Sequence, residues 1–376
     1  MKLTRKSIGR IAASFVATAM LATMAIVPAS ANTGVTEPAE GANNITAIDV
    51  SKVVTTDGNT YAPNTSFTIE VTEGEGKTFD DGTGSVTAVA GIAGGLKGTT
   101  IQSQPDYVEG EGDSQTVVEP EDSYEFEGTL AVDSSVFTAP GIYHYVVKET
   151  TDSYDGIAYS TETYDVYLYV TNNSDYSDYV VSNVVVVKNG QTDAKSDLTF
   201  TNDYGKNNNG THDVKVTKVI AGTLGDKEHD TFSFTVKVNG AEGEVYKVVY
   251  TNDAVEHTTY VVSGDDNAIT VPGVGDQDYI QIFGLSENDT YTVTENDVTN
   301  GKTNDGYTVT DSDNSTAAGT VSGKVTVDGT TATITNTKDA STPTGIMMDI
   351  APYAVLVVIA AAGCFIFLRK RHAKED

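Results

Sequence analysis

Hydrophobic and polar residues alternate with a period of two over most of the chain from Ile45 onward. This alternation is typical of β-strands that bury one face, because successive side chains of a strand point to opposite faces. The runs are rich in Val, Thr, Tyr and Ile and are broken by Gly, Asn and Asp, which favour turns. Between residues 32 and 345, only residues 86–96 are compatible with a short helix. The pattern therefore predicts an all-β chain, with strands that include residues 66–71, 142–149, 164–171 and 179–188.

The strand pattern starts again after a polar, Gly- and Asn-rich stretch at residues 204–211, which predicts a linker. Three short sequences recur in the same order in the two halves. They are Ser66-Phe67-Thr68 and Ser233-Phe234-Thr235, Tyr145-x-Val147-x-Glu149 and Tyr291-x-Val293-x-Glu295, and Thr199-Phe200-Thr201-Asn202 and Thr333-Ile334-Thr335-Asn336. Short strands separated by turns are typical of sandwiches. We therefore expect two tandem Ig-like β-sandwich domains, at residues 45–203 and 212–338.

Six polar residues lie on the apolar face of their predicted strands. Each half carries a lysine in its first strand, a glutamate in a middle strand and an asparagine in its last strand. These are Lys52, Glu149 and Asn202 in the first half, and Lys218, Glu295 and Asn336 in the second. Burying an unpaired Lys or Glu costs several kcal/mol, so the repeated order requires an explanation. Two explanations fit: a buried Lys–Glu ion pair with a hydrogen-bonding Asn, or an intramolecular isopeptide bond between Lys and Asn.

The second explanation follows from the effect of burial on acids and bases. Desolvation lowers the pKa of an amine, so that a buried Lys becomes a neutral nucleophile. It also favours the protonated form of a Glu, which we expect to hydrogen-bond the Asn carboxamide, polarise its carbonyl and transfer protons. The Lys amine would attack the Asn side-chain carbon, and ammonia would leave. A bond from the first to the last strand would carry tension past the domain core.

The start of the chain is typical of an exported protein. Residues 1–31 combine a basic region, an apolar stretch and the cleavage site Ala29-Ser30-Ala31, which predicts a secretory signal peptide. Exported domains are usually reinforced by disulfides. Cys364 is the only cysteine, and it lies in the C-terminal tail. Covalent reinforcement of the exported part would therefore need another chemistry.

The end of the chain resembles a sorting signal. Ser341-Thr342-Pro343-Thr344-Gly345 precedes an apolar run at residues 350–368, which is long enough to span a bilayer as a helix. A basic cluster, Arg369-Lys370-Arg371, would hold the end in the cytoplasm. We interpret residues 341–376 as an LPXTG-like sorting signal that a sortase cuts between Thr344 and Gly345, after Pro343. The alternative is a single-pass membrane protein with a short basic tail.

Charge and composition exclude several other functions. The chain has 23 Lys and Arg residues against 53 Asp and Glu. Between residues 32 and 344, the expected mature chain, there are 15 lysines, no arginine and 50 acidic residues, which excludes nucleic acid as a natural partner. The histidines are scattered without metal-ligand spacing, and no catalytic triad can be argued from the sequence. We therefore expect no metal, no cofactor and no enzyme activity on other molecules.

Four sets of residues point to one family. They are Pro63-Asn64-Thr65-Ser66-Phe67-Thr68, Pro140-Gly141-Ile142-Tyr143, the Thr-x-Thr-Asn strand ends, and Pro343-Thr344-Gly345 with Ala351-Pro352-Tyr353 after it. With these segments the chain resembles the two-domain streptococcal backbone pilins of the T-antigen type. The resemblance implies that Lys52 bonds to Asn202 with help from Glu149, and Lys218 to Asn336 with help from Glu295. The implied protein is structural and catalyses only its own cross-links.

The resemblance also implies assembly at the cell surface. A pilus-specific sortase would join Thr344 of one subunit to a lysine on the first domain of the next identical subunit. The matching position is Lys195, seven residues before Asn202, with Lys188 as the second choice. A housekeeping sortase would attach the pilus to peptidoglycan, and a host glycan or matrix molecule is the expected ligand for adhesion. The alternatives are a wall-anchored monomeric adhesin, an ancillary or basal pilin, and a secreted enzyme.

Overall fold

The computed structural model describes residues 44–80, 84–110, 115–189, 195–207, 209–313 and 317–340. These residues form strands and turns with two short 3-10 helices, η2 (Ser134–Val136) and η3 (Asp265–Asn267), and no α-helix. The all-β prediction is confirmed. No helix in these ranges is long and apolar enough to cross a membrane. The predicted signal peptide and sorting signal lie outside the described residues.

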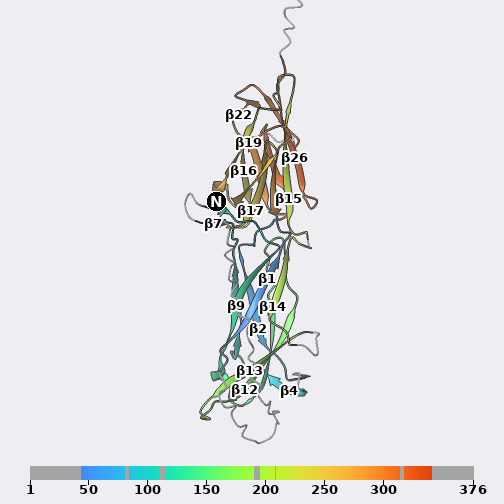
Figure 1. Ribbon diagram of the computed structural model, residues 1–376. Helices are drawn as coiled ribbons and strands as arrows, with labels where there is room; N and C mark the ends of the chain where they lie inside the picture. Colours follow the sequence, from blue (N-terminus) through green and yellow to red (C-terminus); the bar gives the residue numbers. More distant parts are fainter. Residues whose placement is uncertain are drawn as a thin grey trace, which may run out of the picture. The chain divides into compact units, whose positions relative to one another are not determined.

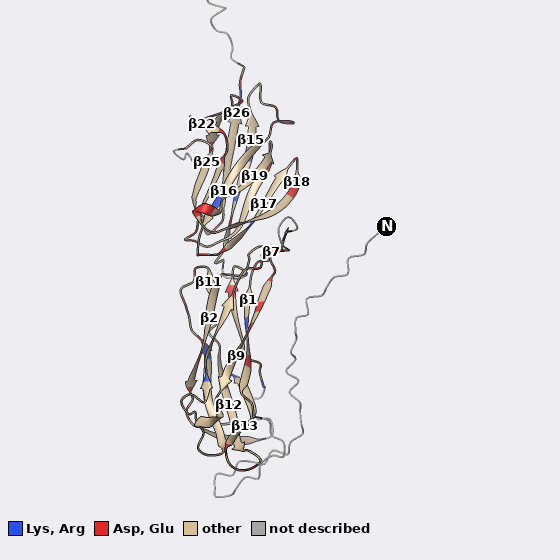
Figure 2. Cartoon of the chain, turned by 90° about the vertical axis from the view of Figure 1, so that its left-hand side faces the viewer, with Lys and Arg blue, Asp and Glu red and all other residues tan. Residues whose placement is uncertain are grey.

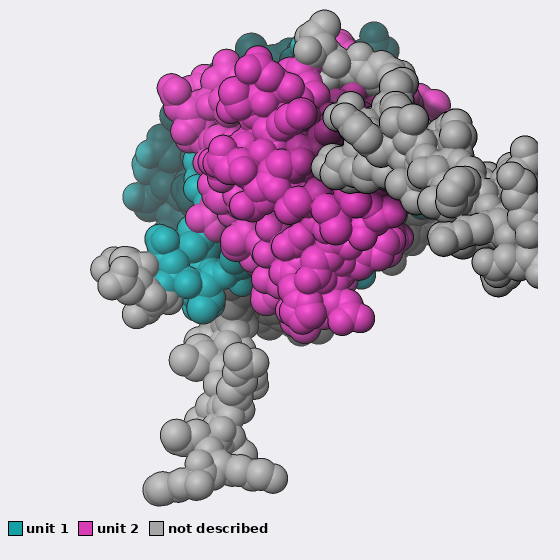
Figure 3. All heavy atoms as spheres, turned by 90° about the horizontal axis from the view of Figure 1, so that it is seen from above, with its two compact units in different colours: residues 1–211 teal, residues 212–376 magenta. Residues whose placement is uncertain are grey.

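The chain divides into two compact units between Thr211 and His212 (Figures 1 and 3). We refer to them as unit 1, up to residue 211, and unit 2, from residue 212. Acidic positions are spread over strands and loops of both units, and basic positions are few (Figure 2). The division falls at the end of the polar stretch that the sequence analysis treats as a linker.

Unit 1 contains two sheets whose inner faces share one core. The first sheet has the strand order β11 (Ile157–Ala158), β14 (Thr199–Tyr204), β1 (Ala47–Thr55), β9 (Ser123–Val132) and β5 (Leu96–Lys97). The second has the order β13 (Tyr179–Lys188), β12 (Thr163–Asn172), β10 (Gly141–Glu149), β2 (Thr65–Glu73) and β6 (Thr99–Ser103). The core contains Val50, Leu130 and Phe200 from the first sheet and Ile69, Val147 and Val166 from the second.

A hairpin packs against the other face of the second sheet. It consists of β3 (Lys77–Asp80) and β4 (Ser85–Ala90), and the end of β4 also pairs with β10. Its Ala88 is buried in a small cluster with Ile142 and Tyr167. The short helix that the sequence analysis allowed at residues 86–96 is therefore wrong, because residues 85–90 form β4. The glycine that follows β4, Gly91, lies so close to β10 that a Cβ there would be 2.5 Å from the His144 carbonyl oxygen.

Two further strands of unit 1, β7 (Val108–Glu109) and β8 (Thr116–Val117), form a separate ribbon.

Unit 2 again has two sheets around one core. The larger sheet has the order β18 (Val255–Val262), β17 (Val245–Asn252), β20 (Tyr279–Leu285), β15 (His212–Ala221), β26 (Thr330–Thr337), β24 (Thr308–Asp311), β23 (Lys302–Thr303) and β22 (Val298–Thr299). The smaller sheet has the order β19 (Ile269–Val274), β16 (Phe232–Asn239), β21 (Thr290–Glu295) and β25 (Thr320–Lys324). Both sheets contribute to one core, for example with Ile282 and Ile334 from the larger and Val236 and Val293 from the smaller.

The first and last strands of each unit are parallel neighbours. β1 pairs with β14 in unit 1, and β15 pairs with β26 in unit 2. In a parallel pair, the start of one strand and the end of the other lie at opposite ends of the pair. The chain therefore enters each unit at one end of this strand pair and leaves at the other.

Candidate cross-link sites

The pairing of β1 and β14 places Lys52 and Asn202 beside each other. Lys52 is opposite Phe200 in the ladder, and Asn202 is opposite Val54. Residues two apart on a strand share a face, so both polar side chains point toward the core from neighbouring positions. Both are 0% exposed.

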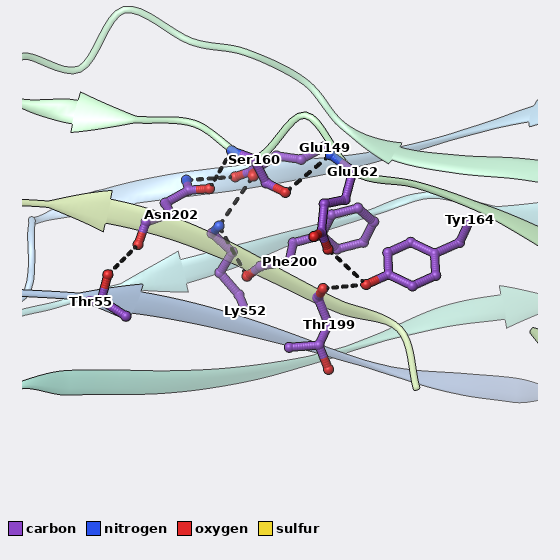
Figure 4. Close-up of polar contacts among 9 residues, drawn as sticks. All are labelled: Lys52, Thr55, Glu149, Ser160, Glu162, Tyr164, Thr199, Phe200 and Asn202. Carbon is purple, nitrogen blue, oxygen red and sulfur yellow. Dashed lines mark hydrogen bonds and ion pairs between the residues drawn. The ribbon is translucent and has the colours of Figure 1, made fainter. Parts of the chain in front are cut away.

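Glu149 reaches the same point from the opposite sheet. It is the last residue of β10 and is buried. Its Oε2 accepts a hydrogen bond from Lys52 Nζ at 3.1 Å, and its Oε1 accepts one from Asn202 Nδ2 at 3.0 Å. Lys52 Nζ also donates to the Phe200 carbonyl oxygen at 3.2 Å. Figure 4 shows these contacts, which bring three residues together from positions far apart in the sequence.

Burial changes the chemistry of the Lys52 amine. Desolvation lowers the pKa of Lys52 from 10.5 to about 8, although the charge and hydrogen bond of Glu149 act in the opposite direction. At pH 7, this shift raises the neutral fraction of the amine by about 300-fold. The amine is therefore a better nucleophile than a surface lysine, and it lies beside a carboxamide whose carbon it can attack.

An aromatic ring covers the amine in unit 1. Lys52 Nζ lies 4.7 Å from the centre of the Phe67 ring, which is itself buried. Phe67 belongs to β2, the strand that pairs with the end of β10. The sequence analysis noted the repeated Ser-Phe-Thr but assigned the phenylalanine no role. Its position excludes water from the amine and so contributes to the desolvation.

Unit 2 repeats the arrangement. In the ladder of β15 and β26, Lys218 is opposite Ile334 and Asn336 is opposite Ile220. Lys218 Nζ lies 2.9 Å from Glu295 Oε2, and Asn336 Nδ2 donates to Glu295 Oε1 at 2.5 Å. All three polar residues are at most 2% exposed.

The electrostatics of the second site match those of the first. Desolvation lowers the pKa of Lys218 to about 8, against the opposing effects of Glu295 and Asp276. The ring centres of Phe232 and Phe234 lie 4.4 and 5.9 Å from Lys218 Nζ. Each unit thus contains one buried Lys–Glu–Asn triad with aromatic cover.

The contacts of the asparagine differ from the expected ones. The sequence analysis expected Glu to polarise the Asn carbonyl, but in both units the carboxylate contacts the amide nitrogen. The carbonyl oxygen of Asn202 instead accepts a hydrogen bond from the backbone N–H of Ser160 at 2.7 Å. Every residue except proline carries such a donor, so no sequence signal could have identified it. The carboxylates are therefore placed to transfer protons to the nitrogen that would leave as ammonia.

The two candidate acceptor lysines differ in their surroundings. Lys195 is exposed, and no hydrogen bond or ion pair involves it within the part of the chain that the structure describes. Lys188, at the end of β13, is paired with Glu162, and 34% of its side chain is exposed. Pro343, Thr344 and Gly345 lie outside the described residues.

Among the described residues, no group of three or more His, Cys, Asp or Glu side chains is arranged to hold a metal ion. Two of the histidines make local contacts instead. His144 Nε2 lies 2.7 Å from Asp165 Oδ1, and His229 Nδ1 lies 3.1 Å from Asp226 Oδ2.

Known proteins match both units. Residues 48–205 match the family described as the Spy0128-like isopeptide containing domain (FctA), and residues 212–338 match a domain of unknown function, DUF7601. A pilin of Streptococcus pyogenes serotype M1 is 28% identical over 254 residues, which cover 63% of this chain and 69% of the relative.

Solved structures show the same fold at lower identity. The crystal structure of the major pilin from Streptococcus pyogenes has a TM-score of 0.53 at 22% identity, covering 79% of this chain and 100% of that chain. A second major pilin of that species, T3.2, has a TM-score of 0.51 at 21% identity, with coverages of 80% and 99%. Residues 48–205 are thus similar to Spy0128-like isopeptide containing domains, and the chain is similar in sequence to a streptococcal pilin and in fold to streptococcal major pilins.

Proposed function

We propose that the chain is the major structural subunit of a sortase-assembled pilus, and that each unit is an Ig-like β-sandwich closed by its own isopeptide bond. The bonds join Lys52 to Asn202 and Lys218 to Asn336. The observation that carries the proposal is the buried Lys–Glu–Asn triad, which occurs twice and each time bridges the first and last strands of a unit. The match to an isopeptide containing domain supports it for unit 1.

All bonds that form and break in the proposed reaction, and the proton that moves, belong to the triad. The neutral Lys amine attacks the Asn side-chain carbon, and a carbon–nitrogen bond forms. The bond between that carbon and the amide nitrogen then breaks. One proton passes from the Lys nitrogen through the Glu carboxylate to the departing nitrogen, and ammonia leaves. The distances of 3.1 and 3.0 Å from Glu149 to Lys52 and Asn202 suit this transfer.

The remaining parts of the proposal concern domains and export. We assign the first sandwich to residues 45–203, the linker to 204–211 and the second sandwich to 212–338. Residues 1–31 would direct export, and residues 341–376 would hold the subunit in the membrane until a sortase cuts between Thr344 and Gly345. The finished pilus would be attached to peptidoglycan at the cell surface, where it supports adhesion. The subunit acts on no other substrate.

We assign the acceptor for the next subunit to Lys195. A lysine must be accessible to attack the sortase-bound Thr344, and its amine must be free of competing partners. Exposed Lys195 meets this requirement better than Lys188, whose amine is paired with Glu162. Lys195 lies just before β14. The residues that follow it are fixed in place, because Ser196 donates its backbone N–H to the Val186 carbonyl and Leu198 is part of the core.

The assembly proposal is tested by the ladder of covalent polymers in cell-wall extracts. Full-length chains that carry Lys195→Ala or Lys188→Ala are produced with the cognate sortases. We expect Lys195→Ala to abolish the ladder and Lys188→Ala, the matched control, to preserve it. An unchanged ladder in both single variants and in the double variant would contradict the assignment of both lysines. A monomer alone in the parent strain would instead favour the wall-anchored adhesin.

A further inference from the structure

The two triads differ at the oxygen of the asparagine. Asn202 Oδ1 accepts a hydrogen bond from the Ser160 backbone N–H at 2.7 Å. Asn336 Oδ1 is buried and has no hydrogen-bond partner among the described residues of unit 2. The contacts of the two carboxylates match. The lysines also differ, because Lys52 Nζ donates to the Phe200 carbonyl oxygen and Lys218 Nζ has no such bond among the described residues. Of the two differences, only the donor to Asn202 Oδ1 contacts an atom that gains negative charge in the proposed reaction.

The difference follows from the strand beside the asparagine. In unit 1 that strand is β11, which pairs with β14 only through Ile157 and Ala158. The chain then leaves the sheet toward β12, and the N–H of Ser160 turns to the asparagine side chain instead of to a backbone carbonyl. In unit 2 the corresponding strand, β24, continues past Asn336 along β26, so that its backbone groups stay in the ladder.

Local contacts hold the Ser160 N–H in place. Ser160 is 8% exposed, and its Oγ accepts a hydrogen bond from the Glu162 backbone N–H at 3.3 Å. Two residues further on, the Tyr164 hydroxyl donates to the Thr199 carbonyl of β14 at 2.6 Å. The turn that carries Ser160 is therefore attached on both sides to the strand of Asn202 (Figure 4).

We propose that the Ser160 backbone N–H is a catalytic donor for the cross-link of unit 1, and that the described residues of unit 2 provide no equivalent. This inference rests on the proposed isopeptide chemistry. When Lys52 Nζ attacks the Asn202 side-chain carbon, the electron pair of the carbonyl moves onto Oδ1. The Ser160 N–H already points at this oxygen and stabilises the negative charge. The charge returns to the carbonyl as the amide nitrogen leaves as ammonia.

A donor of this kind has a known effect on rate. Removal of one preorganised donor to an oxyanion slows acyl transfer by about 100- to 1,000-fold. The two lysines have the same lowered pKa of about 8 and similar carboxylate contacts. We therefore expect the bond of unit 1 to form about 100-fold faster than the bond of unit 2 in the same chain.

The test follows both bonds in one chain. The mature chain, residues 32–344, is purified unfolded, shown by mass to be unlinked, and released from denaturant. Samples are quenched with acid over time and digested, and the linked peptides of Lys52 and Lys218 are quantified by mass spectrometry. Linkage in unit 1 well before unit 2 supports the inference. Equal rates, or a faster unit 2, would overturn it while leaving the proposed function intact. The absence of both linked peptides would overturn the proposed function and this inference with it.

Two variants separate the N–H from the side chain. Ser160→Pro removes the N–H, whereas Ser160→Ala keeps it and removes only the hydroxyl. We expect Ser160→Pro to slow the bond of unit 1 about 100-fold, and Ser160→Ala to change its rate less than threefold. The rate of unit 2 should stay constant in both. Circular dichroism of the folded variants shows whether proline has disrupted the sheet. If it has, the inference is tested by the relative rates of linkage in the two units of the parent chain.

Discussion

At the scale of single residues, burial decides whether a lysine beside an acid becomes a nucleophile or a surface ion pair. Lys77 lies 2.5 Å from Asp165, closer than Lys52 lies to Glu149. Yet 45% of the Lys77 side chain is exposed. Desolvation lowers its pKa, but the hydrogen bond and the charge of Asp165 act together against desolvation, and the net effect is a raised pKa. Burial alone would raise the pKa of Asp165, but the hydrogen bonds and charges of His144 and Lys77 together lower it. A charged amine and an ionised carboxylate do not condense, so this pair stays an ion pair.

The lowered pKa of Lys52 predicts a pH dependence for cross-linking. Only the neutral amine attacks, and its fraction rises about tenfold per pH unit below the pKa. The rate in unit 1 should therefore rise with pH up to about 8 and level off above it, because the pKa of Lys52 is about 8. The rate is measured by mass on chains released from denaturant at a series of pH values. A rate that is independent of pH across this interval would contradict attack by the Lys52 amine.

The sequence identifies the triads because their signal is local and periodic. The alternation of strands puts Lys52 on a face with Val50 and Val54, and the structure buries all three. The sequence could not identify the Ser160 N–H, because a backbone donor carries no side-chain signal. It also could not show which atom of Asn202 faces Glu149, since that depends on contacts between two sheets.

At the scale of strands, each proposed bond joins the first strand of a unit to its last. β1 and β14 are parallel, so a pull on the two ends of unit 1 acts along this strand pair. Lys52 and Asn202 lie within it, and the rest of the unit lies between them in sequence. A covalent bond at this point would therefore carry tension directly from β1 to β14, and the other strands of unit 1 would not bear it.

The same closure predicts a large effect on stability. A cross-link from Lys52 to Asn202 closes a loop of about 150 residues, which in the chain-entropy model contributes about 5 kcal/mol. Asn202→Ala should therefore lower the free energy of unfolding of unit 1 by about that amount and leave the transition of unit 2 unchanged. Urea unfolding with probes in each unit provides the measurement.

Lys77→Met is the matched control for this prediction. It removes a closer Lys–acid contact, but one that is partly exposed and not cross-linked. We expect it to cost less than about 1 kcal/mol, as is usual for exposed ion pairs. Equal effects of Lys77→Met and Asn202→Ala would contradict a covalent link in unit 1.

Strands could be predicted wherever one face of the sheet is buried against a core. Residues 142–149, 164–171 and 179–188 were expected as strands and correspond to β10, β12 and β13. The possible helix at residues 86–96 failed because the small and apolar residues there pack as a hairpin on a second, smaller cluster. Such a cluster depends on contacts with Ile142 and Tyr167 that are distant in sequence.

At the scale of the whole molecule, the chain contains the same structural arrangement twice. Each unit has its own core, its own pair of parallel terminal strands and its own buried triad. Residues 32–344, which we propose to be the exported chain, contain no cysteine, so disulfides cannot reinforce them. Two isopeptide bonds in series, joined end to end by sortase linkages, would give a covalent path through a polymer without any disulfide. The division into two halves could be predicted from the repeat, because the repeated residues belong to corresponding strands.

The most direct test of this account is the intact mass of residues 32–344, the proposed mature chain, beside Glu149→Ala and Glu295→Ala variants. Each bond releases one ammonia, and each glutamate serves one unit. The parent should therefore be lighter than its sequence by two ammonia molecules, and each variant by one. A parent whose mass equals that of its sequence would contradict the account, and the triads would then be buried ion pairs with a hydrogen-bonded asparagine.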